Sequence, residues 1–151
     1  MMSQIDFYHL TGDGLAQAVA MLSDKTVLSG QKMLIITPAQ LTETISEQLW
    51  SAKADTFLAH GVDEGDGASD APVWITTDPD KNQIAAEFVC LTEGLYPTDL
   101  SAFTRIFTLF RDADPHKLAL ARSQWKEWSS DEAHHCRYFA QDEANRWHLK
   151  Q

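Results

Sequence analysis

The chain has 151 residues, 44% of them hydrophobic and 10% aromatic, so we expect one folded domain over residues 1–151 with a sizeable apolar core. Its formal net charge of −10 disfavours direct binding of nucleic acid, because neutralisation of phosphates supplies most of that affinity. The sequence has no apolar run of the roughly 18 residues that a membrane span needs, no basic secretory signal, and only two distant cysteines. These features predict a reduced, cytoplasmic protein.

The charge is distributed unevenly along the chain. Residues 1–104 hold 4 of the 12 Lys and Arg and 15 of the 22 Asp and Glu, a balance of −11, whereas residues 105–151 have a balance of +1. A basic surface in the last third would suit an acidic partner. The alternative is that the negative charge simply keeps the protein soluble.

The first half of the chain alternates between strand-like and helix-like patterns. Residues 5–10 and 33–36 are short apolar runs typical of strands, and each precedes apolar residues at helical spacing, over residues 15–29 and 41–50. A buried strand followed by an amphipathic helix is half of a βαβ unit. A long connection follows, and its Gly- and Asp-rich part, residues 61–70, is expected to be a mobile loop.

The second half continues the alternation and predicts the fold class. Apolar residues from Leu100 to Phe110 recur at helical spacing, and Asp114-Pro115 is typical of a helix start. The alternation predicts a single three-layer α/β domain with a mostly parallel central sheet and helices on both faces, similar to a Rossmann fold. The expected strands are 73–76, 88–91 and 136–140, the expected helices are 100–110 and 115–128, and a short closing element is expected at 146–149.

The motifs of catalysis and cofactor binding are incomplete. Gly12-Asp13-Gly14 follows a predicted strand, but Gln17 stands where a dinucleotide fingerprint has its third glycine, so a turn is the better interpretation. The sequence contains neither a phosphate-binding loop nor a serine nucleophile elbow. His134 and Cys136 would share one face of a strand, but their spacing is not that of a zinc site. We therefore predict no catalytic, cofactor or metal site, with a small α/β nucleotide-binding enzyme as the alternative.

One candidate binding surface lies on the predicted helix after Pro115. Arg122 and Trp125 lie four and seven residues after Leu118, so the three share one helix face, and Lys126 borders it. An aromatic ring beside two cations suits a peptide that ends in a hydrophobic residue and a free carboxylate. The alternative is an ordinary amphipathic helix that buries four apolar residues, Leu118, Ala121, Trp125 and Trp128, in the core.

A second candidate surface combines two large aromatic residues. Trp50 ends a predicted helix, and Phe57 begins the connection after it. Both residues either cap the core or anchor an interface with a partner, since exposed aromatic side chains are common interface anchors.

Several segments resemble the chi subunit of bacterial DNA polymerase III. In chain order they are Phe7-Tyr8-His9-Leu10, Gly30 to Ile36, Ser46 to Trp50 with Phe57 and His60, Ala71-Pro72-Val73-Trp74, and Ala121 to Lys126. The resemblance runs over nearly the whole chain. It implies an α/β fold and a non-catalytic accessory subunit of the replicative polymerase, which links the clamp-loader side of the holoenzyme to single-stranded DNA-binding protein.

The resemblance also implies site residues and partners. Chi proteins bind the acidic C-terminal tail of single-stranded DNA-binding protein, and the tail-binding residues implied here are Arg122, Trp125, Lys126, Lys117 and Phe110. One lysine used by some members corresponds to Leu118. The family's second surface maps onto Trp50 and Phe57, which would dock the psi subunit, another clamp-loader subunit, or a DNA repair helicase. Neither nucleic acid nor a membrane is an expected partner.

Overall fold

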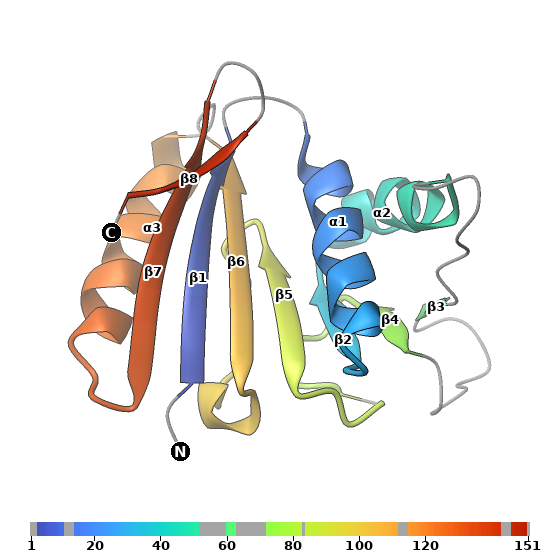
Figure 1. The fold of residues 1–151 in the computed structure, drawn as a ribbon, viewed down its shortest axis with the longest axis horizontal. Coiled ribbons are helices and arrows are strands. Elements are labelled where there is room, and N and C mark those ends of the chain that lie inside the picture. The colour runs from blue at the N-terminus through green and yellow to red at the C-terminus, as the bar shows by residue number, and fades with distance from the viewer. Residues whose placement is uncertain are drawn as a thin grey trace.

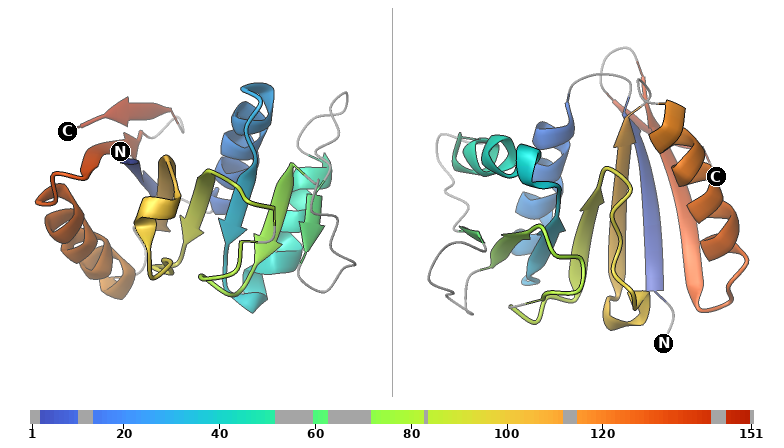
Figure 2. Two further views of the ribbon diagram at one scale, coloured as in Figure 1. Left: turned by 90° about the horizontal axis from the view of Figure 1, so that it is seen from below. Right: turned by 180° about the vertical axis from the view of Figure 1, so that it is seen from behind.

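The computed structural model describes residues 3–10, 14–51, 60–62, 72–82, 84–111, 115–142 and 146–150, without the side chains of residues 50, 51 and 60–62 (Figure 1). Within these ranges, eight strands form one sheet in the order β3-β4-β2-β5-β6-β1-β7-β8, and helices contribute to the cores on both of its faces (Figure 2). The strands are β1 (Ser3–Leu10), β2 (Met33–Ile36), β3 (His60–Val62), β4 (Val73–Thr76), β5 (Phe88–Thr92), β6 (Arg105–Arg111), β7 (His134–Gln141) and β8 (Trp147–Leu149). The helices are α1 (Leu15–Leu28), α2 (Ala39–Ser51) and α3 (Pro115–Ser129), with a 3₁₀ turn, η1, at Leu100–Ala102.

All strand pairs but one are parallel. Strands β3, β4, β2, β5, β6, β1 and β7 pair with their neighbours in parallel, and only β8 runs antiparallel, against β7. The N-terminal strand β1 lies between β6 and β7, so the beginning of the chain is in contact with its last third (Figure 1). The predicted mostly parallel three-layer α/β architecture is thus confirmed.

The central strands are buried on both faces of the sheet. Met33 and Ile35 of β2 belong to the core that α1 and α2 cover, which we call the α1 face. Leu34 and Ile36 belong to the core that includes residues of α3, which we call the α3 face. Because parallel strands covered on both sides are apolar at every position, such a strand appears in the sequence as a continuous hydrophobic run.

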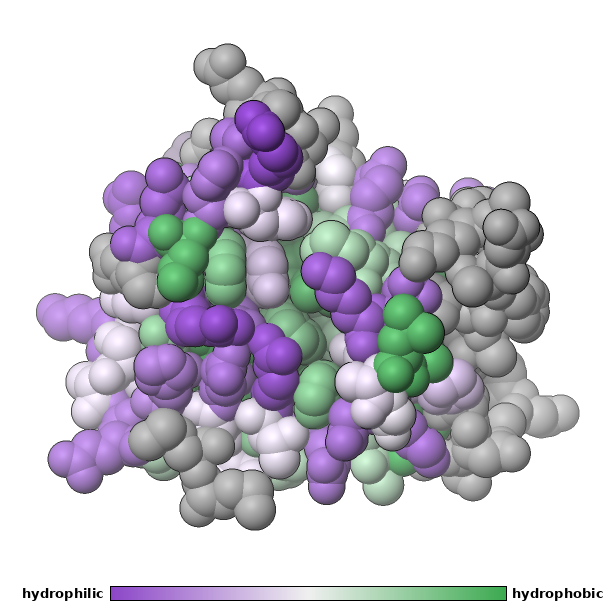
Figure 3. All heavy atoms as spheres, in the orientation of Figure 1, coloured by the Kyte–Doolittle hydropathy of each residue, from purple (hydrophilic) through white to green (hydrophobic). Residues whose placement is uncertain are grey.

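The surface on the side of α1 carries interspersed hydrophobic and hydrophilic residues (Figure 3). Singly exposed apolar residues such as Leu28, which is 75% exposed at the end of α1, are common on soluble domains. Among the described helices, none has the length and hydrophobicity to span a lipid bilayer.

The helix predicted over residues 100–110 is wrong. The chain instead makes the short η1 turn and then the seven-residue strand β6, which pairs with β1 and β5. Phe107 and Leu109 point to the α1 face, whereas Ile106 and Phe110 point to the α3 face. A strand that is apolar on both faces also has apolar residues at helical spacing, so the period alone did not separate the two structures.

The loop predicted over residues 61–70 is also partly wrong. His60–Val62 form the edge strand β3, which pairs in parallel with β4. A three-residue strand of this kind is too short to show a sequence pattern. It forms because its backbone pairs with the neighbouring strand. The rest of the predicted loop lies outside the described residues.

Candidate functional site

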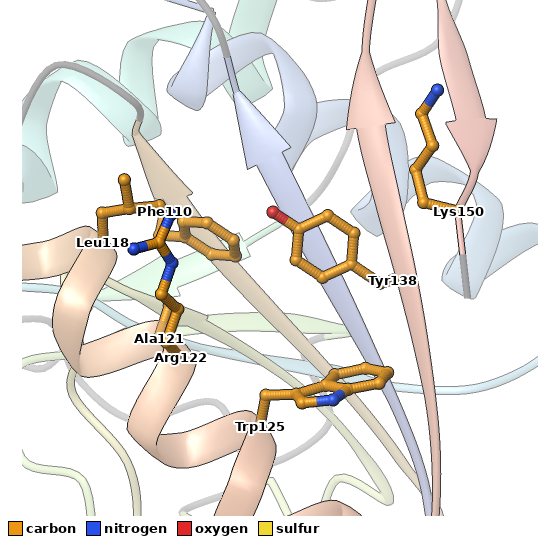
Figure 4. A pocket seen from close by; sticks show the side chains of 7 residues that line it. All are labelled: Phe110, Leu118, Ala121, Arg122, Trp125, Tyr138 and Lys150. Carbon is orange, nitrogen blue, oxygen red and sulfur yellow. The ribbon is translucent and has the colours of Figure 1, made fainter.

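A groove of about 350 Å³ lies on the α3 face, between α3 and the strands β6 and β7 (Figure 4). Its lining combines aromatic rings, aliphatic side chains and two cations. These residues come from α3, from β6 and β7, and from the position directly after β8. The lining residues are Phe110, Leu118, Ala121, Arg122, Trp125, Tyr138 and Lys150.

Helix α3 is fixed against the sheet by buried side chains and by the loop after β5. Ala121 and Trp128 are buried in the α3-face core. Gln124 donates from Nε2 to the carbonyl oxygen of Gly94 at 3.4 Å. Gly94 has a φ of 81°, a left-handed conformation that favours glycine, and its Cα lies close to the tip of the Leu120 side chain of α3. These contacts hold the groove wall in place.

The aromatic side chains of the groove pack against one another. The half-buried Trp125 ring lies edge-on to Phe7, with centroids 5.1 Å apart, and edge-on to Tyr138 at 5.9 Å. Phe110 and Tyr138 have ring centroids 6.0 Å apart. His9 stacks on Phe110 at 5.0 Å, and its Nδ1 lies 2.7 Å from the Tyr138 hydroxyl. The rings therefore form a preorganised apolar surface, which limits the entropy lost when a ligand binds.

The two cations of the groove approach it from opposite walls. Arg122 extends from α3, and Lys150 follows β8, with the Tyr138 ring between them (Figure 4). Both residues are exposed, and neither side chain makes a hydrogen bond or ion pair with any residue that the structure describes. The groove can therefore offer two positive charges to an anionic ligand beside an apolar surface.

Three of the five residues expected to bind the tail come together in this groove: Phe110, Arg122 and Trp125. Lys117 does not line it, since its Nζ donates to the carbonyl oxygen of Glu93 at 2.8 Å. Lys126 is exposed on α3 outside the lining. The core interpretation of α3 also holds in part, because Ala121 and Trp128 are buried while Leu118 and Trp125 are half-buried and line the groove.

Tyr138 and Lys150 are groove residues that the sequence analysis did not assign. Tyr138 lies on the predicted strand 136–140, where alternation along the strand places it on the same face as Cys136. That alternation is the signal that could have assigned it. Lys150 approaches the groove only because β8 folds back along β7, and no local sequence pattern indicates that.

The second predicted surface cannot be described in the same way. Trp50 belongs to α2, but its side chain lies outside the described part of the structure, as does all of Phe57.

The other residues considered for chemistry have structural surroundings. His134 Nε2 lies 3.8 Å from an Asp131 carboxylate oxygen, and burial raises the pKa of the neighbouring Cys136 thiol to about 11. Within the described ranges, no group of three or more His, Cys, Asp or Glu side chains could hold a metal ion. Gly14 precedes α1, whereas the two residues before it lie outside the described part.

The parallel sheet with helices on both faces defines a three-layer α/β protein, and its sequence identifies the family. Residues 2–135 match the family described as DNA polymerase III chi subunit, HolC. The match covers most of the chain, so the chain belongs to this family, and the resemblance noted from the sequence is confirmed. No curated protein matches the chain. Membership makes the protein an accessory subunit of the replicative polymerase and implies association with the DNA polymerase III complex.

Proposed function

We propose that the protein is a non-catalytic, cytoplasmic subunit that binds the C-terminal tail of single-stranded DNA-binding protein in the groove between α3 and β7. It would thereby link the clamp-loader side of the polymerase to the protein that coats the lagging strand. The observation that carries the proposal is the combination of aromatic rings with two cations that have no partner among the described residues. A tail that ends in Phe after a run of acidic residues carries the matching groups.

The groove offers a distinct contact for each part of the tail's last residue. The guanidinium of Arg122 can donate two parallel hydrogen bonds to the terminal carboxylate, and charge-assisted bonds of this kind are stronger than neutral ones. Trp125 and Phe110 offer an apolar surface for the terminal Phe ring. Leu118 adds an aliphatic contact where some family members have a lysine, so fewer charges attract the tail here.

Calorimetric titration of an acidic peptide ending in Phe tests the proposal. Arg122→Ala should cost about 1.5–3 kcal/mol, the range for a hydrogen bond to a charged group. The affinity would then fall about tenfold or more. Arg122→Lys keeps the charge but loses the planar fork, so it should restore only part of the affinity. Lys25→Ala, which removes an exposed charge from α1 on the opposite face, is the matched control and should leave binding unchanged.

An amidated version of the peptide makes the test specific. Amidation removes the terminal carboxylate, so it should weaken binding to the wild type about as much as Arg122→Ala does, and Arg122→Ala should then add little. Unchanged binding of the acidic peptide to both Arg122→Ala and Trp125→Ala would refute the tail site in this groove.

The second partner surface is proposed at Trp50 and Phe57, for the psi subunit, another clamp-loader subunit or a helicase. The proposal rests on the family resemblance at these positions. Phe57→Ala should abolish co-purification of that partner from lysate while leaving tail binding intact. Recovery of polymerase subunits with the wild type would favour the clamp-loader partner, whereas recovery of a helicase alone would favour the adaptor role.

The rival function, a small nucleotide-binding enzyme, makes the opposite prediction. We expect the isolated protein not to hydrolyse ATP, because the sequence contains no phosphate-binding loop. We also expect it not to bind naked single-stranded DNA appreciably, because its net charge is −10. Tight, salt-sensitive binding of an oligonucleotide in a fluorescence titration would contradict this expectation.

A further inference from the structure

The C-terminal hairpin supplies the wall of the groove that faces α3. It consists of β7 and β8, and most of it follows residue 135, where the family match ends. Tyr138 and Lys150 of the groove therefore belong to a part of the chain that the family match does not cover. Nothing in the family assignment gives these two residues a role.

The hairpin holds Lys150 in a defined position beside Tyr138. The backbone N–H of Lys150 donates to the carbonyl oxygen of Tyr138 at 2.7 Å, directly after the antiparallel β7–β8 pairing. On the opposite face, the Trp147 ring lies edge-on to Tyr8 with centroids 5.0 Å apart. Since side chains alternate along a strand, anchoring Trp147 on the α1 face places Lys150 on the α3 face, where it is one of the lining residues of the groove.

The turn of the hairpin is closed by hydrogen bonds around Asp142. Its N–H donates to the carbonyl oxygen of Arg146 at 2.8 Å, and its carboxylate accepts the N–H of Arg146 at 2.9 Å. The same carboxylate lies 2.7 Å from Nε2 of His148. The hairpin therefore has its own local restraints, which fix the start of the segment that leads to Lys150.

Arg122 and Lys150 present different cations across the same set of rings. Arg122 carries a planar fork that matches one carboxylate in two bonds, whereas Lys150 carries a compact charge at the end of a flexible stem. A terminal carboxylate has one fixed geometry and suits the fork. An acidic side chain upstream of it has several rotamers and suits the flexible lysine.

We propose that Lys150 binds an acidic side chain upstream of the terminal Phe and thereby sets the direction of the bound tail. The terminal carboxylate lies at α3, and the acidic run leaves the groove past β8. This inference rests on the proposed tail-binding function and adds a residue that determines specificity. It predicts that the groove selects peptides with an acid at a defined distance from the terminal carboxylate, and not acidic peptides in general.

A double-mutant cycle between protein and peptide tests the proposal. The peptide series replaces each upstream acid in turn with its amide, Asp→Asn, and each peptide is titrated into the wild type, Lys150→Ala and Arg122→Ala. Lys150→Ala should weaken binding of the unmodified peptide about two- to fivefold at low salt, the range of an exposed ion pair. With one particular Asp→Asn peptide, Lys150→Ala should have no further effect, while Arg122→Ala should keep its full effect.

Charge reversal provides a second arm of the test. Lys150→Glu should weaken binding more than Lys150→Ala, and a peptide with Lys at the position found in the cycle should restore it. Lys25→Ala is the matched control and should behave as the wild type with every peptide. Lys150 is exposed and keeps its backbone N–H in all variants, so their melting temperatures should match that of the wild type.

The outcomes separate the two proposals. Absence of peptide binding by the wild type would reject the tail-binding function itself. Binding that responds to Arg122→Ala but not to Lys150→Ala would keep that function and overturn the role of Lys150. A Lys150→Ala effect that is equal for all amide peptides, or that vanishes only when the peptide terminus is amidated, would overturn the proposed direction.

Discussion

Arginines lie beside aromatic rings on both faces of the sheet, but their charges are satisfied on one face only. On the α1 face, Arg105 and Arg137 lie over Phe107 and Phe139 at 4.8 and 5.1 Å from the ring centres. Both donate to the carboxylate of Asp6, whose side chain is 1% exposed, at 2.6 Å and 2.9 Å. On the α3 face, Arg122 lies beside rings as well, yet it has no carboxylate partner within the described residues.

The difference shows that an arginine beside an aromatic ring does not by itself indicate a binding site. The fork of Arg137 binds Asp6 through Nε and Nη2, both at 2.9 Å, which is the two-bond geometry proposed for Arg122 and the tail. The α1 face contains its own carboxylate, so its arginines stabilise the fold. Among the residues that the structure describes, no carboxylate pairs with Arg122 on the α3 face, so in the proposed function the tail supplies it.

The largest effect is expected from removing the internal carboxylate. Asp6→Asn leaves two guanidiniums without their charge partner, and breaking a buried pair in this way costs about 3–5 kcal/mol. Because each arginine side chain is about a third exposed, at 35% and 33%, we expect a loss of unfolding free energy near the lower end of that range. Urea denaturation followed by circular dichroism measures it.

Tail binding should be unaffected by Asp6→Asn at temperatures where the variant is folded. A loss of stability below about 1 kcal/mol would place this cluster with ordinary surface ion pairs. A specific loss of tail affinity in the folded variant would show that the two faces are not independent.

Acid should remove part of the same stabilisation. Burial of the Asp6 carboxyl raises its pKa, but hydrogen bonds from Arg137 and Arg105 outweigh burial and hold the pKa below its usual value. The stabilisation is therefore complete above the unfolded pKa of about 3.9 and is lost as the pH falls through the lower folded pKa. The difference in unfolding free energy between wild type and Asp6→Asn should be constant above the unfolded pKa of about 3.9 and shrink as the pH falls below it. A difference that stays constant on further acidification would contradict the lowered pKa.

Trp125 is expected to contribute to both stability and binding. Trp125→Ala removes edge-on contacts with Phe7 and Tyr138. We expect a loss of about 2 kcal/mol, below the 3–5 kcal/mol of a fully buried Trp, because the side chain is only partly buried. It should also weaken tail binding. Trp125→Phe keeps a ring and should retain most of both, as thermal melting and calorimetry will measure. Full tail affinity in a folded Trp125→Ala variant would show that this ring does not contact the peptide.

The fold was largely predictable where each strand is followed by a helix with one apolar side. The run Met33 to Ile36 and the helix after Pro115 were both recognised, because local composition and position in the sheet agree there. Strand β6 was missed because Ile106 and Phe107 are buried on opposite faces, and a strand that is apolar throughout satisfies the helical period as well.

Only the groove residues on helix α3 could be predicted from the spacing of residues in the sequence. Arg122 and Trp125 lie on a single face of α3, so their spacing indicated that they act together. Lys150 and Tyr138 meet them through the β7–β8 hairpin, and this contact depends on tertiary folding. The same limit applies to Lys117, whose bond to the Glu93 carbonyl oxygen depends on a loop distant in sequence.

The smallest effects distinguish the two lysines that lie outside the groove. Lys117→Ala removes the hydrogen bond from Nζ to Glu93, so it should cost about 1 kcal/mol of stability and little tail affinity. Lys126 is exposed one helical turn after Arg122. Lys126→Ala should cost less than about 1 kcal/mol of binding and no stability, since a charge beside a site mainly speeds association.

The dependence on salt concentration distinguishes a direct contact between Lys126 and the tail from electrostatic attraction at a distance. The effect of Lys126→Ala on the association rate should be clear at low ionic strength and fade at about 0.15 M, where charges beyond roughly 8 Å are screened. Stopped-flow fluorescence of the tryptophans, of which Trp125 lines the groove, measures this rate upon mixing with the peptide. If Lys126→Ala instead slowed nothing and accelerated dissociation as strongly as Arg122→Ala at moderate salt, Lys126 would contact the tail directly, and the binding surface would extend along α3 beyond the groove.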